Sequence, residues 1–132
     1  MLLTSFRYPS SEELIRINRI VLEEIKIRKA DRPQVLSTKG LQSVIEITQQ
    51  TRGDIYDKAV TLLTELVRKH PFASGNRRTA YVALRFFLEA NGQKMKVAHD
   101  PKVLLGIREE FYGRNEIKAW LKGSAIREFK RG

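Results

Sequence analysis

The 132-residue chain contains 42% hydrophobic and 30% charged residues, a balance typical of a folded rather than a disordered protein, and its length suits one domain spanning residues 1–132. It has no cysteine and two histidines, which excludes disulfides and thiolate-bound metals and leaves oxygen as the ligand for any metal ion. Its formal net charge of +10 attracts polyanions, anionic nucleotides and acidic proteins alike, without choosing among them.

Apolar residues recur at helical spacing along most of the chain and predict six helices. Ser10 and Glu13 have capping-box spacing at the start of the first helix, and Pro33 disfavours helical geometry at the residue before it. Asp54 has the position of an N-cap for the third helix, and Asp100, just before a proline, has that position for the fifth. The predicted ranges are 11–29, 41–50, 55–69, 76–91, 101–111 and 115–126.

The segments between these helices carry turn residues and little strand character. Lys39 and Gly40 predict a turn before the second helix, and residues 49–54 predict a loop. The one strand candidate is the alternation of polar and apolar residues at 94–97. We therefore predict an all-α fold class, a compact helical bundle in which the helix 76–91 is central and most buried. No apolar stretch approaches the roughly 20 residues of a membrane span and no signal peptide is recognisable, so we expect a cytoplasmic protein.

The segment between the third and fourth helices joins a histidine, a glycine turn, an amide and two guanidiniums within residues 70–78. Gly75 frees the backbone to approach a ligand, and the helix that starts at Asn76 presents unpaired N–H groups and the positive end of its dipole. Arg78 has the planar guanidinium that binds phosphates bidentately. Together these residues predict a phosphate-binding site.

His70 lies at the end of the preceding helix, where an imidazole can accept a proton from an attacking hydroxyl at neutral pH. Phe72 is predicted to fill the core and to fix the loop. The composition of this loop leaves a second interpretation open, because a histidine at a helix end is more often a structural cap, and paired arginines at a helix start are often simply solvated. The other histidine, His99, is predicted to be a loop residue.

Residues 70–80 have the order His-Pro-Phe-x-x-Gly-Asn-x-Arg-Thr-Ala and are followed by an apolar helix that ends in Asn-Gly. This pattern closely resembles the signature of the Fic/Doc family, and the likeness extends over residues 9–122. Residues 10–15 resemble the opening helix of Doc toxins, and residues 54–70 resemble the helix that precedes their motif. The resemblance implies the helical bundle of this family, with the motif helix at its centre.

The resemblance also implies a function. Family members transfer part of a nucleoside triphosphate to a hydroxyl of a target protein; most Fic enzymes attach AMP, whereas Doc toxins resemble kinases that phosphorylate a translation factor, elongation factor Tu. It therefore implies a toxin of a toxin–antitoxin pair, with ATP or another nucleoside triphosphate as substrate, Mg²⁺ as cofactor and an antitoxin protein as partner. The residue roles that it implies are a general base (His70), a phosphate-cradling turn (Gly75 and Asn76), a phosphate clamp (Arg78) and a core anchor (Phe72).

Two residues depart from the family pattern. Arg77 stands at a nucleotide-contacting position where AMP-transferring members have a small glycine and Doc-type members have a lysine, so it favours phosphoryl transfer over AMP transfer. Ser74 stands where the family has the acidic residue that holds Mg²⁺, and a neutral hydroxyl is a weaker ligand for this ion. A catalytically weakened binding or regulatory module therefore remains an alternative.

Two further interpretations concern regions outside the motif. Charge alone leaves nucleic-acid binding as a third function, which is disfavoured because the sequence shows no interleaved aromatic platform and no known recognition motif. Residues 52–54 fall in the loop where the family places its target-binding flap, and they fit a helix-entry turn equally well.

Overall fold

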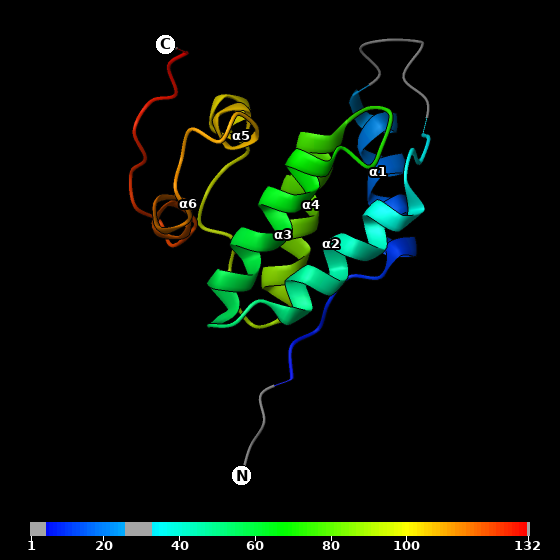
Figure 1. Ribbon diagram of the computed structural model, residues 1–132, viewed down its shortest axis with the longest axis horizontal. Coiled ribbons are helices and arrows are strands. Elements are labelled where there is room, and N and C mark those ends of the chain that lie inside the picture. Colours follow the sequence, from blue (N-terminus) through cyan, green and yellow to red (C-terminus); the bar gives the residue numbers. More distant parts are fainter. Residues whose placement is uncertain (1–4, 26–32, 132) are drawn as a thin grey trace.

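A computed structural model describes residues 5–25 and 33–131 of the chain, and these residues form six helices (Figure 1). Within the same ranges the chain forms no strand, and one isolated antiparallel bridge joins Val35 to Phe72. The predicted all-α class is confirmed. The helices are α1 (Ser11–Ile25), α2 (Thr38–Gln50), α3 (Ile55–Lys69), α4 (Asn76–Ala90), α5 (Pro101–Arg108) and α6 (Arg114–Leu121).

Helix α3 lies at the centre of the bundle, where α2, α4, α5 and α6 all pack against it, while α1 packs on α2 and α4 (Figure 1). Eleven of its 15 residues are buried, against seven of the 15 residues of α4. The prediction that the helix 76–91 is the most buried is therefore wrong. The reason is that one side of α4 is not covered by another helix and carries exposed residues, among them Arg85, Phe86 and Glu89.

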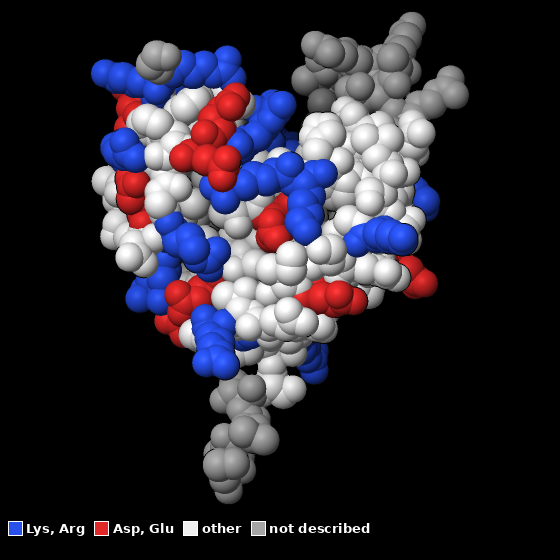
Figure 2. All heavy atoms as spheres, in the orientation of Figure 1, with Lys and Arg blue, Asp and Glu red and all other residues white. Residues whose placement is uncertain are grey.

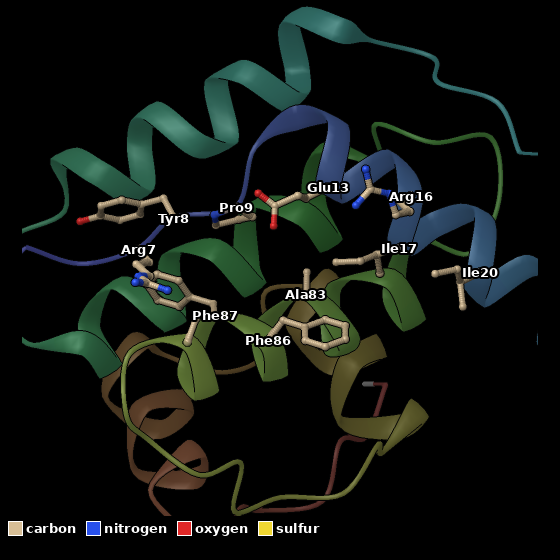
Figure 3. A pocket seen from close by; sticks show the side chains of 11 residues that line it. Arg7, Tyr8, Pro9, Glu13, Arg16, Ile17, Ile20, Ala83, Phe86 and Phe87 are labelled. Atoms are coloured by element: carbon tan, nitrogen blue, oxygen red, sulfur yellow. The ribbon is translucent and has the colours of Figure 1, made fainter.

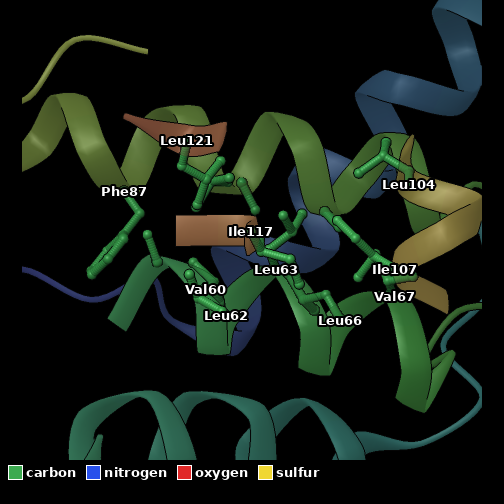
Figure 4. Close-up of a cluster of buried hydrophobic side chains, with 14 of the residues drawn as sticks. Val60, Leu62, Leu63, Leu66, Val67, Phe87, Leu104, Ile107, Ile117 and Leu121 are labelled. Atoms are coloured by element: carbon green, nitrogen blue, oxygen red, sulfur yellow. The ribbon is translucent and has the colours of Figure 1, made fainter. Parts of the chain in front are cut away.

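Hydrophobic side chains of α3 and of the helices around it, most of them aliphatic, build the core (Figure 4). Leu62 and Leu63 of α3 are fully buried, as are Ile117 and Leu121 of α6. Burial of one such side chain stabilises the fold by about 1.5–3 kcal/mol, so the packing of this cluster contributes most to holding the outer helices on α3. Its other labelled members are Val60, Leu66, Val67, Phe87, Leu104 and Ile107.

Helix α2 begins earlier than predicted, at Thr38 rather than at residue 41. Ser37 is its N-cap, and the Ser37 hydroxyl accepts a hydrogen bond of 2.8 Å from the backbone N–H of Gly40. The turn predicted at Lys39 and Gly40 is therefore wrong, because the cap satisfies an N–H of the first helical turn and lets the helix start there. For α1, residues 26–29 of the predicted helix lie outside the described residues.

Helices α5 and α6 end earlier than predicted, at Arg108 rather than 111 and at Leu121 rather than 126. Two left-handed residues follow them, Glu110 with a φ of 58° and Gly123 with a φ of 107°. A left-handed residue ends a helix because it turns the chain away from the helical path.

The strand predicted at 94–97 is not formed. Tyr81 of α4 holds this segment instead, because its hydroxyl donates a hydrogen bond of 2.7 Å to the carbonyl oxygen of Val97. The contact ties the connection between α4 and α5 to α4 and so brings the start of α5 close to it. None of the helices in the described part of the chain is both long and apolar enough to cross a membrane.

Candidate active site

Helix α3 ends at Lys69, and the next residue, His70, is left-handed, with a φ of 53° and a ψ of 56°. Few residues with a side chain adopt this conformation, although histidine does so more readily than most. Pro71 follows and is buried, so the chain turns sharply and leaves the His70 side chain exposed. His70, the residue predicted as general base, therefore has a backbone conformation that the surrounding structure imposes.

Asn76 and Phe72 close the loop after His70 through a pair of hydrogen bonds. Asn76 Oδ1 accepts one of 3.0 Å from the Phe72 N–H, and Asn76 Nδ2 donates one of 2.8 Å to the Phe72 carbonyl oxygen. Phe72 is 1% exposed and lies in the core, and Asn76 is 5% exposed. Because both ends of its amide are engaged with Phe72, the Asn76 side chain is occupied within the loop, and its backbone N–H is the group left for a ligand.

Residues 34–36 lie beside the motif loop, where two main-chain hydrogen bonds of 2.8 and 2.9 Å join them to residues 71–73. Residues 52–54 lie at the opposite end of the 15-residue helix α3, roughly 22 Å away along its axis. A target-binding flap at 52–54 would therefore lie far from the motif loop, and target binding by these residues stays a prediction. These residues form the helix-entry turn, in which Asp54 caps α3.

Helix α4 begins without a side-chain cap. Its N-cap is Gly75, which has a φ of 76° and no side chain to accept a hydrogen bond. The positive φ favours glycine at this position, and a Cβ there would also lie 3.0 Å from Cδ2 of Leu22, which would have to shift. The N–H groups of Asn76, Arg77 and Arg78 therefore have no partner within the helix, and the positive end of its dipole adjoins the loop.

Asn18 of α1 supports the loop from behind, and the sequence analysis missed it. The side chain is 1% exposed, and Asn18 Nδ2 donates hydrogen bonds of 2.9 Å to the Ser74 carbonyl oxygen and 3.1 Å to the Thr79 hydroxyl. It thereby joins α1 to the motif loop and to the first turn of α4. The sequence offered one indication of this role: Asn18 is an amide within the apolar face of α1, between Ile17 and Val21, and a buried amide needs hydrogen-bond partners.

The residues predicted for the site meet at one cleft of about 430 Å³, next to the end of α3 and the start of α4. Phe72, the predicted core anchor, is absent from its lining. The motif residues that line the cleft are His70, Ser74, Gly75, Asn76, Arg77 and Arg78. Lining residues that the sequence did not assign to the site are Val67, Ala73, His99, Pro101 and Arg108.

His99 contacts the predicted phosphate clamp. The two closest nitrogens, Arg78 Nη1 and His99 Nδ1, are 3.5 Å apart, and the His99 ring meets the Tyr81 ring edge-on with centroids 5.4 Å apart. Burial, followed by the charges of Arg78 and Arg77, lowers the pKa of His99, while Asp100 opposes this shift. The lowered pKa favours the neutral imidazole, and in the tautomer with the proton on Nε2 its Nδ1 can accept a hydrogen bond from the guanidinium.

The cleft differs in charge from the rest of the surface. Lys and Arg side chains are scattered over the face seen in Figure 2, where several border Asp and Glu side chains. The cleft gathers the guanidiniums of Arg77, Arg78 and Arg108, and none of the described carboxylates lines it. None of the three forms an ion pair within the described residues. This arrangement is suited to an anion.

The side chains of the cleft do not fit a Mg²⁺ ion held directly by the protein. Mg²⁺ prefers carboxylate oxygens, whereas the cleft offers the Ser74 hydroxyl and an Asn76 amide already engaged with Phe72. No group of three or more His, Cys, Asp or Glu side chains with metal-binding geometry occurs among the described residues.

A larger hollow of about 650 Å³ lies between the segment before α1, α1 and α4 (Figure 3). Its lining contains none of the motif residues and includes the exposed side chains of Phe86 and Ile20. Of the two, the smaller cleft is the candidate active site, because titratable groups converge there with an uncapped helix start.

The chain is similar in sequence to known proteins. A curated relative, Toxin Doc from Mycolicibacterium smegmatis, is 41% identical over 46 residues, which is 35% of this chain and 35% of the relative. The aligned part thus spans about a third of that protein's length. A sequence model of the Fic/DOC family matches residues 8–88, which is more than half of the chain and includes the whole motif. The chain therefore belongs to the Fic/DOC family.

Proposed function

We propose that the chain is a Doc-like toxin that transfers the terminal phosphoryl group of ATP, or of another nucleoside triphosphate, to a hydroxyl of a target protein. Membership of the Fic/DOC family and the similarity to a protein named Toxin Doc support this class of function. The observation that carries the proposal is that His70 and Arg78 line the same cleft as the uncapped start of α4.

In this proposal the target hydroxyl attacks the terminal phosphorus, and its proton passes to the imidazole of His70. A new O–P bond forms while the bond between the terminal phosphorus and the leaving nucleoside diphosphate (ADP when ATP is the substrate) breaks. Arg78 binds oxygens of the transferred group bidentately, and the free N–H groups at the start of α4 bind the phosphates through the backbone.

Arg77 favours phosphoryl transfer over AMP transfer. AMP transfer by the family goes with a small glycine at this position, which leaves an open anion pocket, whereas here a long cationic side chain lines the cleft. AMP transfer remains the second candidate for the same residues.

We further propose an antitoxin segment that lies across the cleft and holds the toxin inactive, and a translation factor as the target. A net charge of +10 and a cleft lined by guanidiniums suit an acidic segment. Both partners would be met in the cytoplasm, where ATP and the translation machinery are found.

Labelled ATP tests the proposal in a bacterial translation extract. We expect label from the γ-phosphate to appear on a protein, and label from the α-phosphate not to. The matched control is His70→Asn, because asparagine tolerates the left-handed backbone at this position while it removes the imidazole. Loss of the base should lower the rate by about 100-fold or more and leave ATP binding intact.

Other outcomes would separate the alternatives. Label that arrives from the α-phosphate would establish AMP transfer in place of phosphoryl transfer. Absence of label from either position, in a protein that still binds ATP, would favour the binding or regulatory module.

Ser74 provides a second test of that module. Ser74→Asp introduces the carboxylate that the family places here, and a carboxylate beside phosphates is unfavourable without a cation. We expect the variant to bind ATP more tightly with Mg²⁺ than without it, and to transfer the phosphoryl group faster than the wild type. Rapid transfer by the wild type with no gain in Ser74→Asp would show that a carboxylate at 74 is not needed.

A further inference from the structure

We propose that Arg108 is a third phosphate-binding residue of the cleft, and that Arg77, Arg78 and Arg108 bind a metal-free polyphosphate chain more tightly than its Mg²⁺ complex. The inference rests on the proposed function, because it specifies how the same cleft takes its nucleotide. Arg108 lies outside the motif, as the last residue of α5, and lines the cleft together with the motif residues.

The end of α5 is fixed in place, so Arg108 has a defined position. Its neighbour Ile107 is fully buried, and the Ile107 carbonyl oxygen accepts a hydrogen bond of 3.0 Å from Arg68 Nε of α3. The preceding helix is short, and this contact ties its final turn to the central helix. Arg108 itself is exposed, so its side chain can reach a ligand without disturbing the core.

The charge of Arg108 is not neutralised by its neighbours. Glu109, the next residue, forms an ion pair of 2.8 Å with Arg131, and Arg108 has no ion pair within the described residues. Arg77 and Arg78 are likewise without a carboxylate partner there. The guanidinium is the side chain best suited to bind phosphate oxygens in pairs, so three of them at one cleft favour a ligand with several adjacent phosphates.

The charges of the described lining residues predict how Mg²⁺ affects binding, because they include three guanidiniums and no carboxylate. A Mg²⁺ ion on a polyphosphate cancels part of the negative charge that the guanidiniums attract. The ion itself would meet cationic side chains in this cleft and no charged oxygen ligand from its lining. Free polyphosphate should therefore bind more tightly than the Mg²⁺ complex.

Calorimetric titration of the whole chain with inorganic triphosphate, and separately with ATP, tests this inference in EDTA and in Mg²⁺. Arg108→Ala should weaken triphosphate binding by about 10-fold or more, the loss expected for a hydrogen bond to a charged group. Arg108→Lys should bind triphosphate with an affinity between those of the wild type and Arg108→Ala, because lysine keeps the positive charge but lacks the planar guanidinium. The control is Arg85→Ala, which removes the same charge from an exposed residue of α4 outside the cleft and should change binding by less than about twofold.

Either of two results would overturn the inference: an Arg108→Ala protein that binds triphosphate as Arg85→Ala does, or wild-type binding that tightens when Mg²⁺ is added. Arg108→Gln serves as a second variant, and circular dichroism verifies the fold of each protein. Binding and transfer are separate readouts, so the two proposals fail separately. If Arg108→Ala loses triphosphate binding while the wild-type protein labels no target, the inference is supported and the proposed transfer is contradicted. If the wild type labels a target and Arg108→Ala binds triphosphate as the wild type does, the proposed transfer is supported and the inference is contradicted.

Discussion

Replacement of Asn18 by alanine removes the only side chain that joins α1 to the motif loop among the described hydrogen bonds. The amide is 1% exposed, and its nitrogen donates to the Ser74 carbonyl oxygen and to the Thr79 hydroxyl. In Asn18→Ala both acceptors lose their donor within a packed interface. The change should therefore destabilise the fold and loosen the loop that carries the site.

The size of the effect follows from these contacts. Each hydrogen bond contributes about 1 kcal/mol net, and the buried Thr79 hydroxyl left without this donor adds to the loss, so we expect a decrease of about 2–4 kcal/mol in the free energy of unfolding. Unfolding entropy is about 2.1 cal/mol/K per residue, or roughly 280 cal/mol/K for 132 residues. The melting temperature should fall by about 7–14 °C.

Thermal denaturation followed by circular dichroism measures this shift, and a double-mutant cycle assigns it. Thr79→Val removes one of the two acceptors while it keeps the shape of the side chain. If Asn18 and Thr79 interact as described, the double variant should lose less stability than the sum of the single variants. The reasoning is refuted if Asn18→Ala lowers the melting temperature by less than about 3 °C, or if the two changes are simply additive.

Two further predictions concern the loop and its neighbour. Gly75→Ala should destabilise the protein more than Gly92→Ala. Both residues have a positive φ, at which a side chain costs about 1–2 kcal/mol, but only at Gly75 does the new Cβ also meet a side chain of α1. Equal melting temperatures of the two variants would contradict this. Burial, and then the charge of Arg78, hold the pKa of His99 below its ordinary value of 6.5, although Asp100 opposes this shift. His99 therefore binds a proton more readily in the unfolded chain than in the folded protein, and the free energy of unfolding should fall as the pH is lowered through 6.5. His99→Gln should flatten this dependence in melting curves between about pH 7.5 and 5.5, and parallel curves for the two proteins would disprove the assignment.

Local signals in the sequence were sufficient for α3 and α4. Asp54 caps α3 through its side chain, and Gly92 follows the end of α4 with a φ of 83°, so both elements begin and end close to their predicted residues. The ends of α5 and α6 were harder to predict. Glu110 adopts a left-handed conformation although it has a side chain, so no glycine marked the end of α5. That residues 1–132 form one domain stays a prediction.

The candidate site was predictable only where it is contiguous in sequence. His70 to Arg78 form one loop and one helical turn, so their composition and order are enough to indicate a phosphate site. His99 and Arg108 reach the cleft through tertiary packing, on the loop before α5 and at the end of that helix. Nothing in their local sequence distinguishes them from other surface residues of a basic chain, and the roles of all these residues in transfer stay predictions.

The uncapped start of α4 has a practical consequence for handling the protein. Backbone N–H groups that no side chain caps lie beside guanidiniums without an ion pair among the described residues, and we expect this site to bind small oxyanions from the solution. Phosphate and sulfate buffers should therefore raise the melting temperature and compete with nucleotide, whereas chloride solutions of an amine buffer should do neither. A preparation stored in phosphate would look more stable and less active than the same protein after exchange, so comparisons between preparations require a common anion.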